Sequence, residues 1–184
     1  MMSHKELILI LGGSRSGKSE FAEQLAGVDG DQVCYLATGV VTDLEMKKRV
    51  EQHQKRRSPH WGTIEEPLNP LKALETLKGF CGILLMDSLS GWLANLLYQY
   101  PWGTFPWGDQ EEAKALAEVE SLLKSLGQAT YSSLIVGDEV GMGLVPPSPE
   151  GRAFRDLNGK ANQLVAAAAD QVYFIIAGQP LKIK

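Results

Sequence analysis

The feature that most constrains this chain is a glycine-rich segment that directly follows an apolar run. The run is LILIL at 7–11, and the segment GGSRSGKS at 12–19 fits the phosphate-binding pattern G-x-x-x-x-G-K-[ST]. Residues 20–25 favour a helix, so the segment joins an expected strand to an expected helix, as this pattern requires. The alternative is a glycine-rich turn with a surface lysine, but strand, spacing, Gly-Lys-Ser and helix all agree on a phosphate loop.

The residue types in this segment predict its chemistry. Glycines let backbone N–H groups turn toward phosphate oxygens, because no Cβ blocks the approach. The helix that begins here points its free N–H groups and the positive end of its dipole at the same place. We therefore expect Lys18 to reach the terminal phosphates and the Ser19 hydroxyl to bind Mg²⁺. The other residues of the predicted phosphate loop are Gly12, Gly13, Ser14, Arg15, Ser16 and Gly17.

Apolar, β-prone runs recur along the chain, mainly with helical patterns between them. The runs lie at 6–11, 32–37, 82–87, 132–137 and 171–177. Strands that alternate with helices predict an α/β fold with a mostly parallel sheet and helices on both faces. We expect helices at 44–57, at 110–127 with Gly127 in the C′ position, and at 150–169. Because no linker or repeat interrupts the pattern, we expect one domain over 1–184.

Composition and charge narrow the functional classes. Hydrophobic residues make up 44% of the chain and charged residues 22%, which is typical of a soluble globular protein. A net charge of −4 argues against general nucleic-acid binding, which usually needs a basic face. The N-terminal apolar run is too short for a signal peptide or a membrane span. Cys34 and Cys81 lie in apolar stretches without C-x-x-C spacing, so we expect buried, reduced thiols and a cytoplasmic protein.

The expected strand at 82–87 ends in Asp87. An aspartate in this position often accompanies a phosphate loop, since its carboxylate binds Mg²⁺ directly or through water. Asp87 could instead cap the following helix, although Ser88 could fill that role. Because the phosphate loop is present, we favour Asp87 as a ligand of Mg²⁺.

The basic segment at 44–57 contains one histidine, His53. In a helix, Arg49, His53 and Arg57 are four residues apart and share one face. One interpretation is a solvated basic helix with an ordinary surface histidine. The other is a phosphoryl- or nucleotidyl-transfer histidine, because the flanking arginines disfavour protonation of the ring and can clamp a triphosphate. The residues alone permit both.

Two further segments, at 61–66 and at 100–108, allow either a functional or a structural role. Trp61 could stack on a base or pack in the core, and Glu65 and Glu66 could bind a guanine edge or a ribose, or be solvated. The aromatic loop YPWGTFPWG at 100–108 could be a lid, a subunit contact or a loop packed against the core.

The segment GDEVGMGLVPP at 137–147 follows another expected strand. Ligands bind at the carboxyl ends of parallel strands, so Asp138 or Glu139 could act as a base or contact a metal. A structural turn is the alternative, since three glycines and two prolines fix the path of the backbone.

Taken together, segments over almost the whole chain resemble one family, in order and at natural spacing. They are GGSRSGKS at 12–19, YLAT at 35–38, RVEQHQKRRSPHW at 49–61, LLMDSLSGWLANLL at 84–97, DEVGMGLVP at 138–146, FRDLNGKANQLVAAAADQVY at 154–173 and AGQPLKIK at 177–184. On these segments the chain is similar to the bifunctional adenosylcobinamide kinase / adenosylcobinamide-phosphate guanylyltransferase of cobalamin biosynthesis. EVGMGLVP and the R-x₃-H-x₃-R-x₃-W spacing are far more specific than the phosphate loop.

The resemblance implies a P-loop NTPase-like (RecA-like) three-layer sandwich and two linked reactions. ATP or GTP first phosphorylates the aminopropanol hydroxyl of adenosylcobinamide. GTP then guanylylates an enzyme histidine with release of pyrophosphate, and the GMP passes to adenosylcobinamide phosphate to give adenosylcobinamide-GDP. The matching histidine is His53, with Lys18 serving both steps; Mg²⁺ and a homotrimer are also implied. The implied nucleotide contacts outside the phosphate loop are Ala37, Thr38, Gly39, Arg49, Gln54, Arg57, Glu65 and Asp87.

The chain departs from the family pattern in few places. Asp138 stands where members often carry Asn, which bears on the kinase half, and the loop at 100–108 is unusually rich in tryptophan. One alternative is an enzyme that keeps only guanylyl transfer. Another is a nucleotide-binding regulatory or assembly module without turnover, which would lack counterparts of Lys18, His53 or Asp87, and all three are present.

Overall fold

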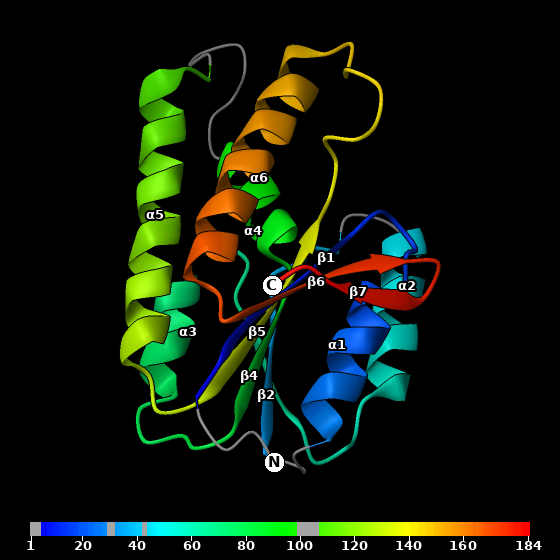
Figure 1. Ribbon diagram of the computed structural model, residues 1–184, viewed down its shortest axis with the longest axis vertical. Helices are drawn as coiled ribbons and strands as arrows, with labels where there is room; N and C mark the ends of the chain where they lie inside the picture. The colour runs from blue at the N-terminus through cyan, green and yellow to red at the C-terminus, as the bar shows by residue number, and fades with distance from the viewer. Residues whose placement is uncertain (1–4, 29–31, 42–43, 99–106) are drawn as a thin grey trace.

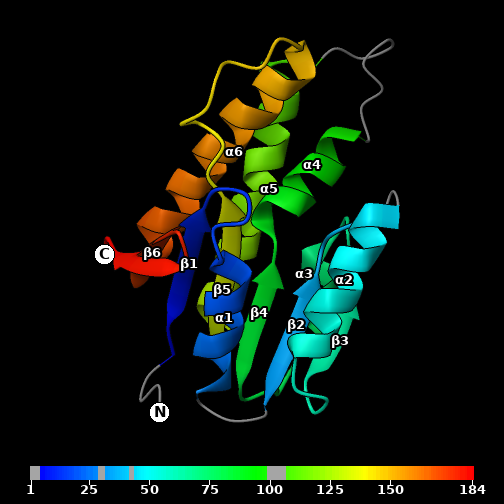
Figure 2. The same ribbon diagram turned by 90° about the vertical axis from the view of Figure 1, so that its right-hand side faces the viewer.

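The computed structural model describes residues 5–28, 32–41, 44–98 and 107–184, apart from the side chains of residues 45–47, 49 and 98. Within these ranges a seven-stranded sheet lies between two layers of helices (Figures 1 and 2). The strands are β1 (Leu7–Gly12), β2 (Val33–Ala37), β3 (Gly62–Glu65), β4 (Ile83–Asp87), β5 (Ser132–Asp138), β6 (Gln171–Ile176) and β7 (Gln179–Lys182). The helices are α1 (Lys18–Gly27), α2 (Leu44–Arg56), α3 (Pro70–Thr76), α4 (Leu89–Tyr98), α5 (Asp109–Gln128) and α6 (Pro149–Ala168).

The sheet order is β3-β2-β4-β5-β1-β6-β7, and every neighbouring pair is parallel except β6 and β7. β1 lies between β5 and β6, with Leu9 in register with Ile135 on one side and Val172 on the other. Because this strand is covered on both faces, its side chains are apolar without alternation. The phosphate loop therefore begins at the end of a rigid interior strand.

Alternate side chains of the strands face two separate cores. Leu9 and Met86 pack with α3, α4, α5 and α6 on one face of the sheet. Ile10 and Val136 pack with α1 on the other face. Figure 1 shows this division, and Figure 2, turned toward the α1 side, shows α2 beyond α1 at the β2–β3 side of the sheet. The three layers agree with the α/β sandwich that we expect from the sequence.

Short polar signals begin two of the helices. Asn69 Oδ1 accepts a hydrogen bond from the backbone N–H of Lys72 at the start of α3, and Ser148 Oγ accepts one from Gly151 at the start of α6. A proline follows each cap, where its fixed φ suits the first helical position and its missing N–H removes no hydrogen bond.

The five predicted strands and the predicted helices are present, but some details differ. The edge strands β3 and β7 were not predicted, because they are four residues long and mostly exposed, and so show no apolar run. Gly127 is not past the end of α5, which continues to Gln128. Cys34 is buried, whereas Cys81 is exposed, so the expectation of two buried thiols is wrong for Cys81. No helix in the described part of the chain is long and apolar enough to cross a membrane.

Candidate active site

The turn between β6 and β7 lies against the phosphate loop and is hydrogen-bonded to it. The backbone N–H of Gly178 donates to the carbonyl of Ser16 at 2.8 Å. Gly17 has a φ of 96°, and a Cβ there would lie 3.2 Å from the Cα of Gly178. Only glycine fits both the left-handed backbone and this close approach. The C-terminal hairpin thus fixes the path of the loop.

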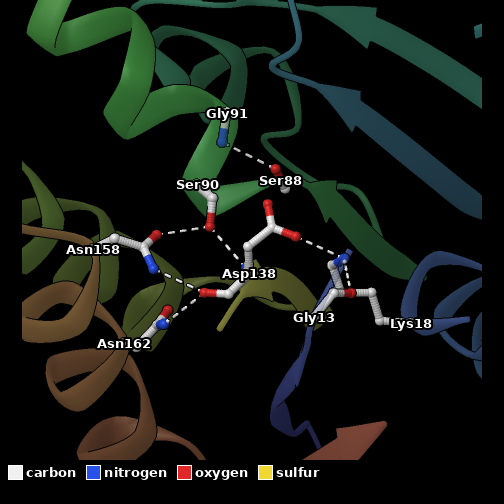
Figure 3. A network of polar contacts seen from close by, with 8 residues as sticks. All are labelled: Gly13, Lys18, Ser88, Ser90, Gly91, Asp138, Asn158 and Asn162. Carbon is white, nitrogen blue, oxygen red and sulfur yellow. Dashed lines mark hydrogen bonds and ion pairs between the residues drawn. The ribbon is translucent and has the colours of Figure 1, made fainter. Parts of the chain in front are cut away.

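The side-chain ammonium group of Lys18 contacts two other groups of the protein. Its Nζ donates to the carbonyl of Gly13 at 3.1 Å and lies 2.6 Å from Oδ1 of Asp138 (Figure 3). The Lys18 side chain is 12% exposed and that of Asp138 is 35% exposed. Asp138, which the sequence suggested as a base or metal ligand, is here the counter-ion of the phosphate-loop lysine.

A buried hydrogen-bond network fixes the backbone of Asp138 (Figure 3). Its N–H donates to Ser90 Oγ, and its carbonyl accepts from Asn158 and Asn162. The Ser90 hydroxyl donates in turn to Asn158 Oδ1 at 2.7 Å. All three partner residues are buried, so the end of β5 is tied firmly to α4 and α6. The neighbouring Glu139 instead accepts from backbone N–H groups of its own loop.

Asp87 lies at the end of β4 and is not the cap of the next helix. Ser88 Oγ accepts from the backbone N–H of Gly91 and so caps α4. Oδ2 of Asp87 accepts from the Tyr35 hydroxyl at 2.7 Å. Burial, together with the Asp87 charge, raises the pKa of Tyr35 well above its ordinary value, so the phenol stays a donor. The hydrogen bond from Tyr35 therefore orients the Asp87 carboxylate. Because Ser88 caps α4, the carboxylate is available to bind a ligand such as Mg²⁺.

The donor set near Lys18 suits Mg²⁺ bound together with phosphates. Ser19 and Asp87 both line the same cavity and offer a hydroxyl and a carboxylate oxygen. Mg²⁺ is commonly held by one or two carboxylates with water and substrate phosphates, so these two residues fit it. Among the described residues no group of three or more His, Cys, Asp or Glu side chains could hold a metal ion.

His53 lies on α2 and faces α1. Its Nδ1 is 3.3 Å from a terminal nitrogen of Arg56 and 3.7 Å from Oε1 of Glu23. Arg57 lies with its guanidinium carbon 3.2 Å from the centre of the Tyr35 ring and its Nε 3.6 Å from the same Glu23 oxygen. Burial alone would raise the pKa of Glu23, but the polar contact of His53 and the hydrogen bond and charge of Arg56 outweigh it and lower that pKa. The side chain of Arg49 lies outside the described part of the structure.

One cavity of about 680 Å³ joins the phosphate loop to His53. It is lined by ten of the residues that we selected from the sequence: Lys18, Ser19, Ala37, Gly39, His53, Gln54, Arg57, Glu65, Asp87 and Asp138. Thr38 is fully buried and exchanges two hydrogen bonds with the backbone of Ser88 through its Oγ1. Thr38 therefore supports the wall of the cavity. Asp138 and Phe154 complete the wall near Lys18 and α6.

A second cavity, of about 430 Å³, adjoins the first and shares Gln54, Arg57, Thr63 and Glu65 with it. Trp61 lines this second cavity and also packs against the core around α1. The two roles that the sequence left open for Trp61 are thus compatible. Of the aromatic loop, residues 100–106 lie outside the described residues, and Trp107 packs against the core around α5.

Comparison with known proteins shows the family to which the chain belongs. Residues 8–183 match the model of the cobinamide kinase / cobinamide phosphate guanyltransferase family. The chain belongs to this family. It is 38% identical over 181 residues to the bifunctional adenosylcobalamin biosynthesis protein CobU of Escherichia coli (strain K12), which covers 97% of this chain and 99% of that protein. It is 39% identical over 178 residues, 96% of each chain, to the bifunctional adenosylcobalamin biosynthesis protein CobP of Pseudomonas aeruginosa (strain PAO1).

The fold of this cobinamide kinase / cobinamide phosphate guanyltransferase is shared more widely. The crystal structure of the flagellar accessory protein FlaH from Methanocaldococcus jannaschii aligns with a TM-score of 0.51 at 16% identity. The match covers 98% of this chain and 79% of FlaH. At this identity the likeness concerns the fold alone, and it agrees with the expected RecA-like sandwich.

Sequence reasoning missed several residues that shape the site. Glu23 was counted only as part of the helix after the phosphate loop, although it lies between Ala22 and Ala26, which are fully buried. An acidic residue on the apolar stripe of a helix is a signal that could have been read. Ser90, Asn158 and Asn162 gave no local signal, because their importance depends on contacts far apart in the chain.

Proposed function

We propose that the cavity of about 680 Å³ is a single active site for both reactions of the family. One observation carries this proposal: Lys18 of the phosphate loop and His53 of α2 line the same cavity. The family's activity is phosphorylation of cobinamide and guanylyl transfer to cobinamide phosphate. A shared cavity lets one triphosphate site serve both reactions in turn.

In the kinase step, the phosphate loop binds the triphosphate of ATP or GTP. Lys18 leaves Asp138 for the β- and γ-phosphates and neutralises the charge that develops as the γ-phosphoryl group is transferred. Ser19 and Asp87 would hold Mg²⁺, which supplies charge neutralisation at the phosphates when bound. The hydroxyl of the aminopropanol arm of adenosylcobinamide is the acceptor.

In the guanylyl-transfer step, His53 attacks the α-phosphorus of GTP. Arg57 and Lys18, which both line the cavity, orient the triphosphate and stabilise the departing pyrophosphate. A covalent histidine intermediate divides one difficult exchange into two displacements. Glu65 lines both cavities, and Trp61 lines the second, which supports a role for Glu65 in accepting hydrogen bonds from the N–H groups of guanine.

Radiolabel transfer tests the second step. With Mg²⁺ and GTP labelled at the α-phosphate, the protein should retain label that is lost in acid and survives alkali. His53→Asn should retain none, and label on that variant would refute the assignment. For the kinase step, Lys18→Ala should abolish phosphorylation of adenosylcobinamide, and persistence of this activity would show that the phosphates bind elsewhere.

The resemblance also implies a homotrimer, which we include in the proposal. Sedimentation equilibrium of the purified chain should give the mass of a trimer. A monomeric mass at the concentrations of the activity assays would refute this part alone.

A further inference from the structure

A buried carboxylate lies against the helix that carries His53. Glu23, on α1, is 8% exposed. Its Oε1 is 3.7 Å from Nδ1 of His53 and 3.6 Å from Nε of Arg57, and its Oε2 is 3.3 Å from Nε of Arg56. A negative charge behind a site that binds triphosphate opposes binding by simple electrostatics. The presence of Glu23 at this position therefore needs an explanation other than triphosphate binding.

The hydrogen bonding of this carboxylate is incomplete. Oε1 of Glu23 and Nε of Arg57 are both buried and have no hydrogen-bond partner within the described residues. A buried acceptor without a donor is unfavourable, so a small movement that brings a donor closer is strongly favoured. His53 Nδ1 is one of the two nitrogens within reach, provided that it carries the proton.

Two neighbours of Nδ1 require opposite tautomers of His53. The Arg56 guanidinium only donates, so its contact suits an Nδ1 that has a lone pair, with the ring proton on Nε2. The Glu23 carboxylate only accepts, so its contact suits a proton on Nδ1 and leaves the lone pair on Nε2. Oε2 of Glu23 also accepts a hydrogen bond from Nε of Arg56, so the same carboxylate contacts both His53 and the competing donor.

We propose that Glu23 is the positioning residue of His53: it accepts the Nδ1 proton and so presents the Nε2 lone pair to the α-phosphorus of GTP. The inference rests on the proposed function, in which His53 carries GMP. The Nε2 lone pair forms the N–P bond while the bond from the α-phosphorus to its bridging oxygen breaks, and pyrophosphate leaves with that electron pair. Nδ1 keeps its proton, and Glu23 balances the cationic ring.

The second displacement reverses this charge. A phosphate oxygen of the acceptor attacks the phosphorus, the N–P bond breaks, and its electron pair returns to Nε2. The ring becomes neutral again with its proton still on Nδ1. Glu23 thus acts through His53 in both halves of the transfer without touching either substrate.

The first test needs no variant. Nitrogen-15 NMR of the labelled protein, with the pH raised until the ring signals no longer change, distinguishes the two tautomers of the neutral ring. The chain has three histidines, and the signals missing from His53→Asn identify those of His53. We expect a protonated Nδ1 and an unprotonated Nε2. A proton on Nε2 would overturn the proposal.

The second test measures the rate of guanylylation in Glu23→Gln. The glutamine amide has nearly the same size, but its NH₂ group favours the wrong tautomer. We expect the rate at saturating GTP to fall roughly 10- to 100-fold, by analogy with the loss seen when the carboxylate partner of a metal-binding histidine is removed. The half-saturating GTP concentration should stay within about 3-fold, since the nucleotide contacts remain. The matched control is Glu51→Gln, an exposed position on α2 that loses the same charge and should keep the wild-type rate.

The outcomes separate the two hypotheses. A wild-type rate in Glu23→Gln, or an effect confined to the half-saturating concentration, overturns the positioning role. Absence of acid-labile label on the wild-type protein refutes the proposed function instead, while the tautomer of His53 still reports on Glu23. If Glu23→Gln does not fold, the spectrum of the wild-type protein decides alone.

Discussion

The ion pair between Lys18 and Asp138 predicts that Asp138→Asn will bind nucleotide more tightly. Lys18 must leave Asp138 to reach the phosphates, so each binding event breaks the contact of 2.6 Å. The Asp138 carboxylate also lies on the same cavity wall and repels the incoming triphosphate. Asparagine removes both penalties and keeps the side-chain shape.

The burial of the pair sets the size of the effect. Exposed ion pairs contribute about 0.2–1 kcal/mol, and breaking a fully buried pair costs about 3–5 kcal/mol. With side chains 12% and 35% exposed, this pair lies between these limits. We take about 1–2 kcal/mol, which corresponds to roughly 5- to 30-fold in affinity.

Isothermal titration with a non-hydrolysable triphosphate analogue and Mg²⁺ measures this change directly. The backbone of residue 138 should not move, because Ser90, Asn158 and Asn162 bind its N–H and carbonyl groups in either variant. Asp109→Asn, at the exposed start of α5, controls for the change in net charge. Unchanged or weaker binding by Asp138→Asn would refute the argument that this carboxylate holds Lys18 back.

Three further changes test other contacts. Gly17→Ala should lower the thermal midpoint and abolish nucleotide binding, because its Cβ meets Gly178 at a left-handed backbone position; unaltered binding would refute the requirement for glycine. Ser90→Ala should lower the free energy of unfolding in urea by about 1–3 kcal/mol, because it leaves Asn158 Oδ1 without its buried donor. A decrease of less than about 0.3 kcal/mol would contradict the network. The lowered pKa of Glu23 means that its stabilising effect is present above the ordinary pKa near 4.5 and is lost as the pH falls through the lowered value. The stability difference between wild type and Glu23→Gln should therefore shrink on acidification from pH about 6 to 3, and a constant difference would contradict this linkage.

The sequence predicted the parts of the fold whose signals are local. β1 and its phosphate loop follow from an apolar run and a fixed spacing, and the structure places Lys18 and Ser19 in the main cavity. The weakly apolar edge strand β3 has no such signal, because its place depends on pairing with β2. For the same reason the helix spacing suggested His53, but not the carboxylate that faces it.

The contacts that were not predicted join distant segments. Glu23 and His53 are thirty positions apart in the numbering, and Asp138 meets Lys18 only because β5 lies beside β1 in the sheet. Local propensity contains no information about such pairs. The assignment of roles to individual residues remains a prediction that the experiments above test.

The position of β1 has a consequence for biosynthesis. This strand is made well before its two neighbours in the sheet, β5 and β6, which begin only at Ser132 and Gln171. The turn that supports the phosphate loop, at Gly178, follows β6 and is made later still. A ribosome that has made β1 but not β6 therefore holds a nucleotide-binding motif without its supporting strands, and the phosphate site can be completed only after the turn at Gly178 has emerged. Pairings of such long sequence separation are also slow to form, so a nascent chain halted before β6 should present a loop that recognises no nucleotide.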